Sequence, residues 1–158
     1  MIKLLFVCMG NICRSPTAHA VMQHKINQAG IRQDVVIESA GTHAYHVGEK
    51  SDARSRAKAK EKGIDMEFIR ARKISVLDYD NFDWIFAMDR DNLELINYYA
   101  PDNHSAQIEL FLARAHARGK VDCDEVPDPY YGSGEGFERV FRLVDAGADV
   151  LLSELCRR

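Results

Sequence analysis

The stretch that decides the fold is IKLLFVCMGNICRSP, which runs from Ile2 to Pro16. Its first six residues are almost continuously apolar, a pattern typical of a parallel strand that is buried on both faces. The glycine, asparagine, serine and proline that follow mark a loop, and we expect Ser15 to cap a helix whose first position is Pro16. Helically spaced apolar residues continue up to Gly30, which ends the helix. The sequence therefore predicts a strand, a loop and a helix in succession.

The rest of the chain continues this alternation of strands and helices. Short apolar runs predict further strands at 35–37, 84–87 and 107–112, with helical stretches between them. The clearest helix begins at Phe137, where apolar side chains recur every three or four residues toward the end of the chain. Alternating strands and helices are typical of a parallel α/β sheet. With neither an internal repeat nor a linker, we expect a single domain over residues 1–158.

Bulk composition narrows the class of protein. The chain has 158 residues, 46% of them hydrophobic and 28% charged, with a formal net charge of −3. This length suits one domain that needs neither a metal nor a disulfide for stability. Nucleic-acid binders normally carry a basic footprint, so we expect no such partner. The first apolar run is too short for a signal peptide or a membrane span. The four cysteines fit no zinc pattern and indicate free thiols in the cytoplasm.

The segment from Cys8 to Ser15 has the residues that an anion-binding loop needs. Ligands of open parallel sheets bind beyond the carboxyl ends of the strands, where a loop entering a helix turns backbone N–H groups toward one point. Arg14 can bind two phosphate oxygens through parallel hydrogen bonds. The same positive field favours the thiolate of Cys8, a nucleophile for phosphorus, which the Ser15 hydroxyl can hydrogen-bond. A lone buried cysteine is usually only a small hydrophobic residue, but this spacing of cysteine, arginine and serine favours the catalytic role.

The segment FVCMGNICRSP resembles the signature of the low-molecular-weight protein tyrosine phosphatases, which is cysteine, five residues, arginine, then serine or threonine. The segments ESAGT (38–42), AMD (87–89) and DPYY (128–131) resemble further parts of that family, so the resemblance extends along most of the chain. It implies a three-layer α/β/α fold with a four-stranded parallel sheet, of the Rossmann-like phosphotyrosine phosphatase I type. It also implies hydrolysis of phosphotyrosine in proteins, and of small aryl phosphates, through a phosphoenzyme on Cys8.

The resemblance assigns roles to the other site residues. Asp128 lies between two prolines that restrict its loop, and it is the expected general acid and base. For an arbitrary aspartate, ordinary turn chemistry would be the better interpretation. Asn11 is expected to hold the loop open in a left-handed conformation, with Ser39 as its hydrogen-bond partner. The expected phosphate- and substrate-binding residues, among which the tyrosines wall an aromatic slot, are Met9, Gly10, Asn11, Ile12, Cys13, Ser15, Tyr45, Tyr130 and Tyr131.

Several side chains stay outside this assignment or add to it. Many members of the family have a histidine where Ile69 stands, and we assign Ile69 no role. The six histidines lie mostly in helix-surface or loop contexts, and we treat them as solvated. Cys13 is a candidate to trap an oxidised Cys8 as a reversible disulfide. No metal or organic cofactor is implied, because Arg14 and the loop amides supply the positive field.

Other functions remain open on the same fold. An arsenate reductase would need further cysteines after the third predicted strand, and 87–99 contains none. An arginine phosphatase would carry threonine in place of Ile12. A phosphocysteine carrier or a phosphate-binding module would need no general acid, and turnover of an aryl phosphate would separate these from an enzyme. The expected partners are a phosphotyrosine protein as substrate, inorganic phosphate as product and a tyrosine kinase. We expect a monomer or a weak homodimer formed through Tyr130 and Tyr131, with no membrane partner.

Overall fold

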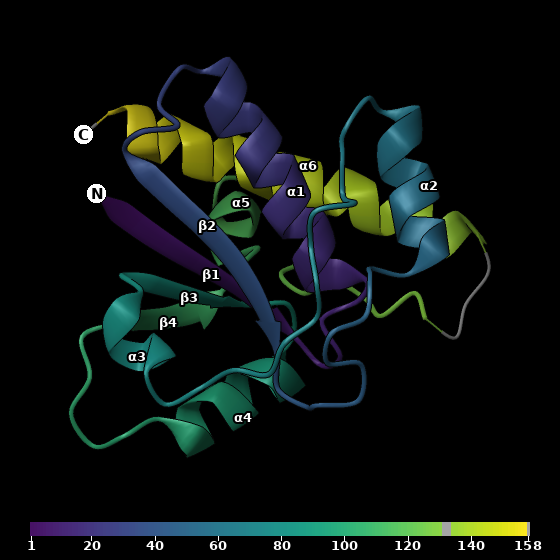
Figure 1. The fold of residues 1–158 in the computed structure, drawn as a ribbon. Helices are drawn as coiled ribbons and strands as arrows, with labels where there is room; N and C mark the ends of the chain where they lie inside the picture. The colour runs from purple at the N-terminus through teal and green to yellow at the C-terminus, as the bar shows by residue number, and fades with distance from the viewer. Residues whose placement is uncertain (131–133, 158) are drawn as a thin grey trace.

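The centre of the fold is a four-stranded parallel sheet with the strand order β2-β1-β3-β4 (Figure 1). The structure is a computed structural model that describes residues 1–130 and 134–157. The strands are β1 (Ile2–Cys8), β2 (Val35–Gly41), β3 (Trp84–Ala87) and β4 (Gln107–Leu110). The predicted parallel α/β sheet is confirmed, although β2 extends further and β4 ends earlier than the sequence indicated.

Helices cover both faces of this sheet and make the fold three-layered (Figure 1). They are α1 (Arg14–Gln28), α2 (Ala53–Glu61), α3 (Asp78–Asn81), α4 (Arg90–Tyr99), α5 (Ala113–Ala117) and α6 (Gly134–Cys156). Helices α1 and α6 pack on one face, and α3 and α4 pack on the other. Helix α2 packs against α6 at the margin of the first layer. Among the described residues, none of these helices combines the length and apolar character that crossing a bilayer requires.

The apolar sequence of β1 follows from its place inside the sheet. Leu4, Phe6 and Cys8 join the hydrophobic core under α1 and α6, while Leu5 and Val7 join the core under α3 and α4. All five side chains are 3% exposed or less. Because successive side chains of a strand point to opposite faces, a strand that is covered on both sides needs apolar residues at every position.

The ends of α1 differ in part from the expectation. The helix begins at Arg14 with Cys13 as its N-cap, and no side chain caps it. The prediction of Ser15 as N-cap and Pro16 as first residue was therefore wrong. Pro16 still lies in the first turn, where its missing N–H breaks no helical hydrogen bond. Gly30 ends the helix as predicted, with a φ of 75° that favours glycine.

The carboxyl ends of three strands meet at one edge of the sheet. In the sheet register Cys8 lies opposite Gly41, and Val7 lies opposite Ala87. The loop after β1, the end of β2 and the loop after β3 therefore lie side by side. Segments that are far apart in the sequence meet here, at the N-terminus of α1 (Figure 1).

Candidate active site

The loop of residues 9–13 crosses this edge between β1 and α1. Its Met9 carbonyl accepts a hydrogen bond from the backbone N–H of His43 (3.0 Å). The loop lies so close to β2 that a side-chain carbon on Gly41 would come within 2.6 Å of the Met9 carbonyl oxygen. The backbone N–H groups of residues 9–13 have no hydrogen-bond partner within the described part of the chain. Buried N–H groups nearly always have a partner in proteins, so this set of donors is suited to bind an anion.

Asn11 adopts the left-handed conformation that the family resemblance implied, with a φ of 58°. Its side-chain nitrogen donates to the Ser15 hydroxyl (2.8 Å), and its side-chain oxygen accepts from the backbone N–H of Arg72 (3.0 Å). The prediction of Ser39 as the partner of Asn11 was wrong. Ser39 pairs with Phe6 in the sheet register, two residues before the end of β1, so it lies below the loop.

Cys8 is the last residue of β1, and its side chain lies under the loop at 3% exposure. Its Sγ is 3.0 Å from the Ser15 hydroxyl. That hydroxyl accepts from Asn11, so its own proton is available for Cys8 or for the Ala40 carbonyl at 3.3 Å. A hydroxyl proton directed at sulfur stabilises a thiolate. Ser15 is thus a supporting group for Cys8 rather than a helix cap.

Arg14, the first residue of α1, is held in one orientation by groups from two distant segments. Its Nη1 donates to the Asp89 carboxylate (2.5 Å) and to the Val126 carbonyl (3.0 Å). The side chain is only 3% exposed. Burial by itself lowers the pKa of Arg14, but the negative charges of Cys8, Asp89 and Asp128 outweigh it and raise that pKa. The guanidinium therefore stays charged beside the cysteine.

Asp128 approaches the same point from the loop that precedes α6. One carboxylate oxygen is 3.6 Å from Nη2 of Arg14. The other accepts a hydrogen bond from the backbone N–H of Tyr130 (3.0 Å). The Asp128 side chain is 31% exposed, so it remains accessible to substrate and water. A thiol, a guanidinium and a carboxyl group are thus brought together from three separate segments.

These groups open into one cavity of about 230 Å³. Its lining residues are Cys8, Met9, Gly10, Ile12, Cys13, Arg14, Tyr45, His46, Asp128 and Tyr130. Tyr45 is 67% exposed and Tyr130 is 37% exposed, so both rings stand at the rim. The ring of Tyr45 stacks on that of His43, with centroids 5.0 Å apart. Asn11 supports the loop without lining the cavity. Tyr131, predicted as another wall, lies outside the described residues.

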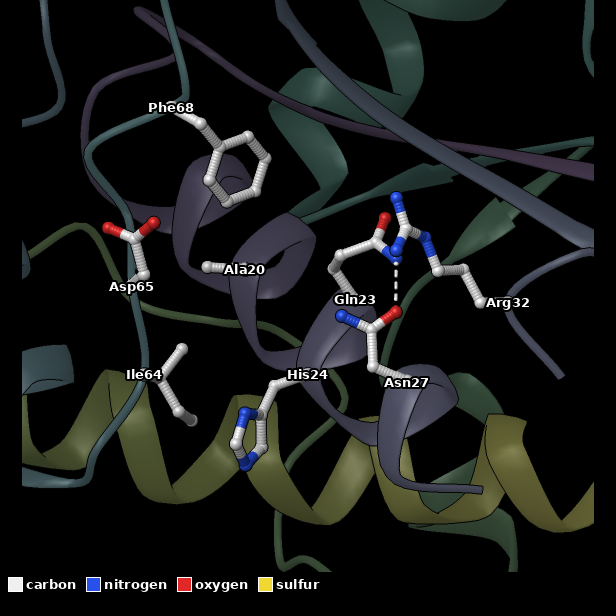
Figure 2. Close-up of a pocket in the computed structure, with 8 residues that line it drawn as sticks. All are labelled: Ala20, Gln23, His24, Asn27, Arg32, Ile64, Asp65 and Phe68. Atoms are coloured by element: carbon white, nitrogen blue, oxygen red, sulfur yellow. Dashed lines mark hydrogen bonds between the residues drawn. The ribbon is translucent and has the colours of Figure 1, made fainter. Parts of the chain in front are cut away.

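A larger hollow of about 500 Å³ lies beside α1 and has different chemistry (Figure 2). It is lined by Ala20, Gln23, His24 and Asn27 of α1 and by Arg32, Ile64, Asp65 and Phe68 from segments beside that helix. It contains no cysteine and none of the predicted site residues. A nucleophile beside a buried cation and an exposed acid is the stronger mark of catalysis. The smaller cavity is therefore the candidate active site.

Sequence reasoning missed two contributors to this site. Asp89 belongs to the segment AMD (87–89), which was given no role in the site. It caps α4 by accepting a hydrogen bond from the Asn92 N–H (2.8 Å), and it also binds Arg14. His46 was treated as a solvated histidine, yet it lines the cavity and pairs with Glu49 (2.6 Å). A signal existed for Asp89, which lies two residues after the end of β3, a strand that pairs with β1. The sequence contained no comparable signal for His46.

His19 corrects the expectation that the histidines are solvated. It lies within α1, and its Nδ1 is 3.0 Å from the Ser39 hydroxyl. Its ring packs edge-on against Phe68, with centroids 5.3 Å apart. Burial and, secondarily, the charge of Arg72 lower the pKa of His19 to about 4.

Ile69, which stands where many members of the family have a histidine, is 3% exposed and belongs to the hydrophobic core.

Cys13 lines the cavity but differs in character from the expected redox partner. Burial is the main reason that the pKa of Cys13 is raised to about 12, with contributions from the charges of Asp52 and Cys8. Cys8 and Cys13 are both free thiols in the structure. A thiol of such high pKa reacts slowly, which argues against rapid trapping of Cys8. Disulfide formation between Cys8 and Cys13 stays a prediction.

Comparison with known proteins relates this geometry to a family. The low molecular weight phosphotyrosine protein phosphatase family matches residues 3–158. A phosphatase of that name from Schizosaccharomyces pombe is 43% identical, over 96% of this chain and 96% of its own length. A crystal structure of a protein tyrosine phosphatase from Entamoeba histolytica with Hepes in its active site superposes with a TM-score of 0.92, at 37% identity, covering 99% of this chain and 98% of that one.

A second similar structure is a Drosophila arginine phosphatase, with a TM-score of 0.90, 30% identity and 98% coverage of both chains. The fold is thus shared by proteins named for different phosphoamino acids. The family match nevertheless spans nearly the whole chain, and the Schizosaccharomyces relative is well above 30% identical. The chain therefore belongs to the low molecular weight phosphotyrosine protein phosphatase family.

Proposed function

We propose that this phosphatase works in two steps, with Cys8 as nucleophile, Arg14 as phosphate clamp and Asp128 as general acid and then base. The observation that carries the proposal is the convergence of these three side chains on one cavity. In the first step the Cys8 thiolate attacks phosphorus, and the phosphate–tyrosine bond breaks. The leaving phenolate takes a proton from Asp128. The products of this step are free tyrosine hydroxyl and a phosphocysteine.

In the second step a water molecule attacks the phosphocysteine and gives a proton to Asp128. The Cys8 thiolate leaves, and its hydrogen bond with Ser15 stabilises it again. The N–H groups of residues 9–13, which bond to no other described residue, and the guanidinium of Arg14 are the donors available to the charge that builds up on the phosphoryl oxygens. Donors fixed in place before the reaction stabilise such a transition state without reorganisation.

The walls of the cavity support an aromatic ester as substrate. Tyr45 and Tyr130 stand at its rim, and Ile12 contributes an apolar side chain that is 9% exposed. A phenyl ring gains from apolar and aromatic contact, whereas a guanidinium needs hydrogen-bond acceptors. The arginine phosphatase of similar fold makes phosphoarginine the alternative to test. We expect phosphotyrosine peptides to be turned over faster, and Ile12→Thr to reduce the difference.

Hydrolysis of para-nitrophenyl phosphate in EDTA tests the mechanism. We expect turnover by the wild type, none by Cys8→Ser, and a loss for Asp128→Ala that reaches about 10²- to 10⁴-fold with an aryl phosphate of poorer leaving group, such as phenyl phosphate. Asp124→Ala is the matched control, because Asp124 pairs with Arg90 and does not line the cavity. Trapped phosphocysteine on Cys8 would support the covalent step directly. An active Cys8→Ser variant would overturn the proposal.

The domain organisation, the cellular compartment, the oligomeric state and the opposing kinase are also proposals. The family match over residues 3–158 supports one domain over the whole chain. A reducing compartment such as the cytoplasm suits a catalytic Cys8 that must remain a thiol. The exposed Tyr130 supports a monomer or weak homodimer, and the family's chemistry supports a tyrosine kinase as the opposing enzyme. Sedimentation at several protein concentrations tests the oligomeric state.

A further inference from the structure

Arg54 lies in the first turn of α2, beside the loop that carries Asp128. Asp52 caps this helix by accepting a hydrogen bond from the Arg54 backbone N–H (2.8 Å). The same carboxylate accepts from Nε (3.1 Å) and Nη2 (3.0 Å) of the Arg54 side chain. Two parallel hydrogen bonds fix the plane of a guanidinium, which a single contact does not. Asp52 therefore holds Arg54 in one orientation.

The guanidinium held in this way contacts the acid loop. Its Nη2 donates to the Tyr130 carbonyl (3.2 Å). Its central carbon lies 5.6 Å from the centroid of the Tyr130 ring and 4.6 Å from that of Phe137 in α6. The backbone N–H of Tyr130 in turn donates to Asp128 (3.0 Å). Arg54 therefore binds the residue whose N–H orients the carboxyl group of Asp128.

The pair formed by Asp52 and Arg54 is also bonded to the phosphate loop, the loop of residues 9–13 between β1 and α1. The backbone N–H of Asp52 donates to the Ile12 carbonyl (2.8 Å). A continuous set of contacts thus runs from Ile12 through Asp52, Arg54 and Tyr130 to Asp128. The acid loop has an anchor upstream as well, where the Val126 N–H donates to the Met88 carbonyl (2.8 Å). Arg54 acts on the other side of Asp128.

We propose that Arg54, held by Asp52, is a positioning residue that fixes the carboxyl group of Asp128 relative to the phosphate loop. This inference rests on the proposed role of Asp128 as general acid. Arg54 does not line the cavity, so it acts through Tyr130 and not by touching the reacting atoms. Without it, the phosphate loop still binds phosphate and Cys8 still attacks. The two proton transfers of Asp128 become slower: protonation of the leaving group in the first step and deprotonation of water in the second.

The test uses two small substrates that differ in their need for an acid. Phenyl phosphate releases a phenol with a pKa near that of tyrosine, about 10, and depends strongly on protonation. Para-nitrophenyl phosphate releases a much better leaving group and depends on it less. The quantity to compare is kcat/KM, because it reports the first step and excludes hydrolysis of the phosphocysteine, in which Asp128 acts as base for both substrates alike. We expect Arg54→Ala to lower kcat/KM for phenyl phosphate roughly 10- to 100-fold, a part of the full effect of an acid. For para-nitrophenyl phosphate we expect kcat/KM to fall less than about 3-fold.

Three further variants sharpen the result. Arg56→Ala is the matched control, because Arg56 lies on the same helix and pairs with Glu67 away from the acid loop; both rates should stay unchanged. Arg54→Lys keeps the charge without the planar fork and should not restore phenyl phosphate turnover. Asp52→Asn keeps an N-cap acceptor but weakens the hold on Arg54. It should reproduce the same selective loss, even if Arg54→Ala proves unstable.

Asp128→Ala separates failure of this inference from failure of the proposed function. If Asp128→Ala shows the selective loss and the Arg54 and Asp52 variants do not, the positioning role is wrong and the general acid stands. If Asp128→Ala lowers kcat/KM equally for both substrates, the assigned acid itself is wrong. An equal loss of both substrates in the Arg54 and Asp52 variants would indicate a general structural role and would also overturn the inference.

Discussion

His19 should make the stability of this protein fall in mild acid. Its imidazole is enclosed between α1, the Ser39 hydroxyl and the ring of Phe68. Burial first, and the positive charge of Arg72 second, lower the pKa of His19 from 6.5 to about 4. The folded protein therefore resists protonation of this ring, whereas the unfolded chain accepts a proton near the ordinary pKa.

The size and sign of the effect follow from proton linkage. A pKa difference of one corresponds to about 1.4 kcal/mol, so the difference between 6.5 and about 4 corresponds to about 3 kcal/mol. Below pH 6.5 the unfolded state binds the proton and the folded state does not. The stabilising contribution of the neutral ring is therefore complete above about pH 6.5 and is lost as the pH falls toward 4. Other titrating groups add to this dependence, so the comparison must be made between variants.

Urea unfolding at several pH values between 7.5 and 4.5 provides the assay. We expect wild type to lose about 2–3 kcal/mol more over this interval than His19→Gln, which has no group to protonate. His24→Gln is the control, because His24 lies on the same helix and faces the open hollow (Figure 2). It should follow the wild-type curve. Equal losses in wild type and His19→Gln, or an NMR titration of His19 with a midpoint near 6.5, would refute the reasoning.

Two further substitutions test the packing and the charge balance of the fold. Gly147→Ala should destabilise the protein by about 1–3 kcal/mol in urea unfolding, because the added carbon would lie 2.8 Å from the Phe111 ring and 2.9 Å from Leu112; an unchanged midpoint would contradict this. Asp89→Ala should cost about 3 kcal/mol or more by leaving the buried charge of Arg14 without its carboxylate, and Asp89→Asn should cost about 1 kcal/mol less because an N-cap acceptor remains. If the two Asp89 variants are equally stable, the cap contributes nothing.

The sequence was most informative where structure is local. The apolar run of β1, the turn at Asn11 and the start of a helix near Arg14 lie within a few residues of one another. Their geometry follows from backbone preferences and burial, and the structure agrees except at the first turn of α1. There the Ser15 hydroxyl bonds to Cys8, as expected for the anion-binding loop, and caps no backbone N–H of the helix, so the two expectations for Ser15 were not both met. The contact of Ser15 with the active-site cysteine thus replaces the preference of serine for capping a helix.

Contacts between residues that are far apart in the sequence could not be predicted from these local patterns. The carboxylate that orients Arg14 lies 75 residues away, at Asp89. The partner of Asn11 is the backbone of Arg72, which a loop brings beside the end of β2. His19 is covered by Phe68, which belongs to that same connecting segment. Hydrophobic periodicity predicts which face of a helix is buried by the sheet, but it carries no information about which loop covers the other side.

The topology of the sheet explains why Cys8 needs few contacts outside the sheet to hold its position. Strand β1 lies between β2 and β3, and the helices that follow β1 and β3 pack on opposite faces of the sheet. Such a switch in direction leaves a crevice at the carboxyl end of the central strand, and Cys8 is the residue placed there. Strand pairing fixes the position of Cys8, which lies opposite Gly41 of β2, while its neighbour Val7 lies opposite Ala87 of β3.

Asp128 has no such support, because it belongs to a loop outside the sheet. Its distance from Cys8 depends on the contacts that hold that loop, and the loop is tied to Met88 through Val126 and to α2 through Tyr130. Misplacement of about 1 Å costs a catalytic group much of its effect. Selection on such a site should therefore act on Arg54 and Asp52, which touch no substrate, as well as on the residues that do.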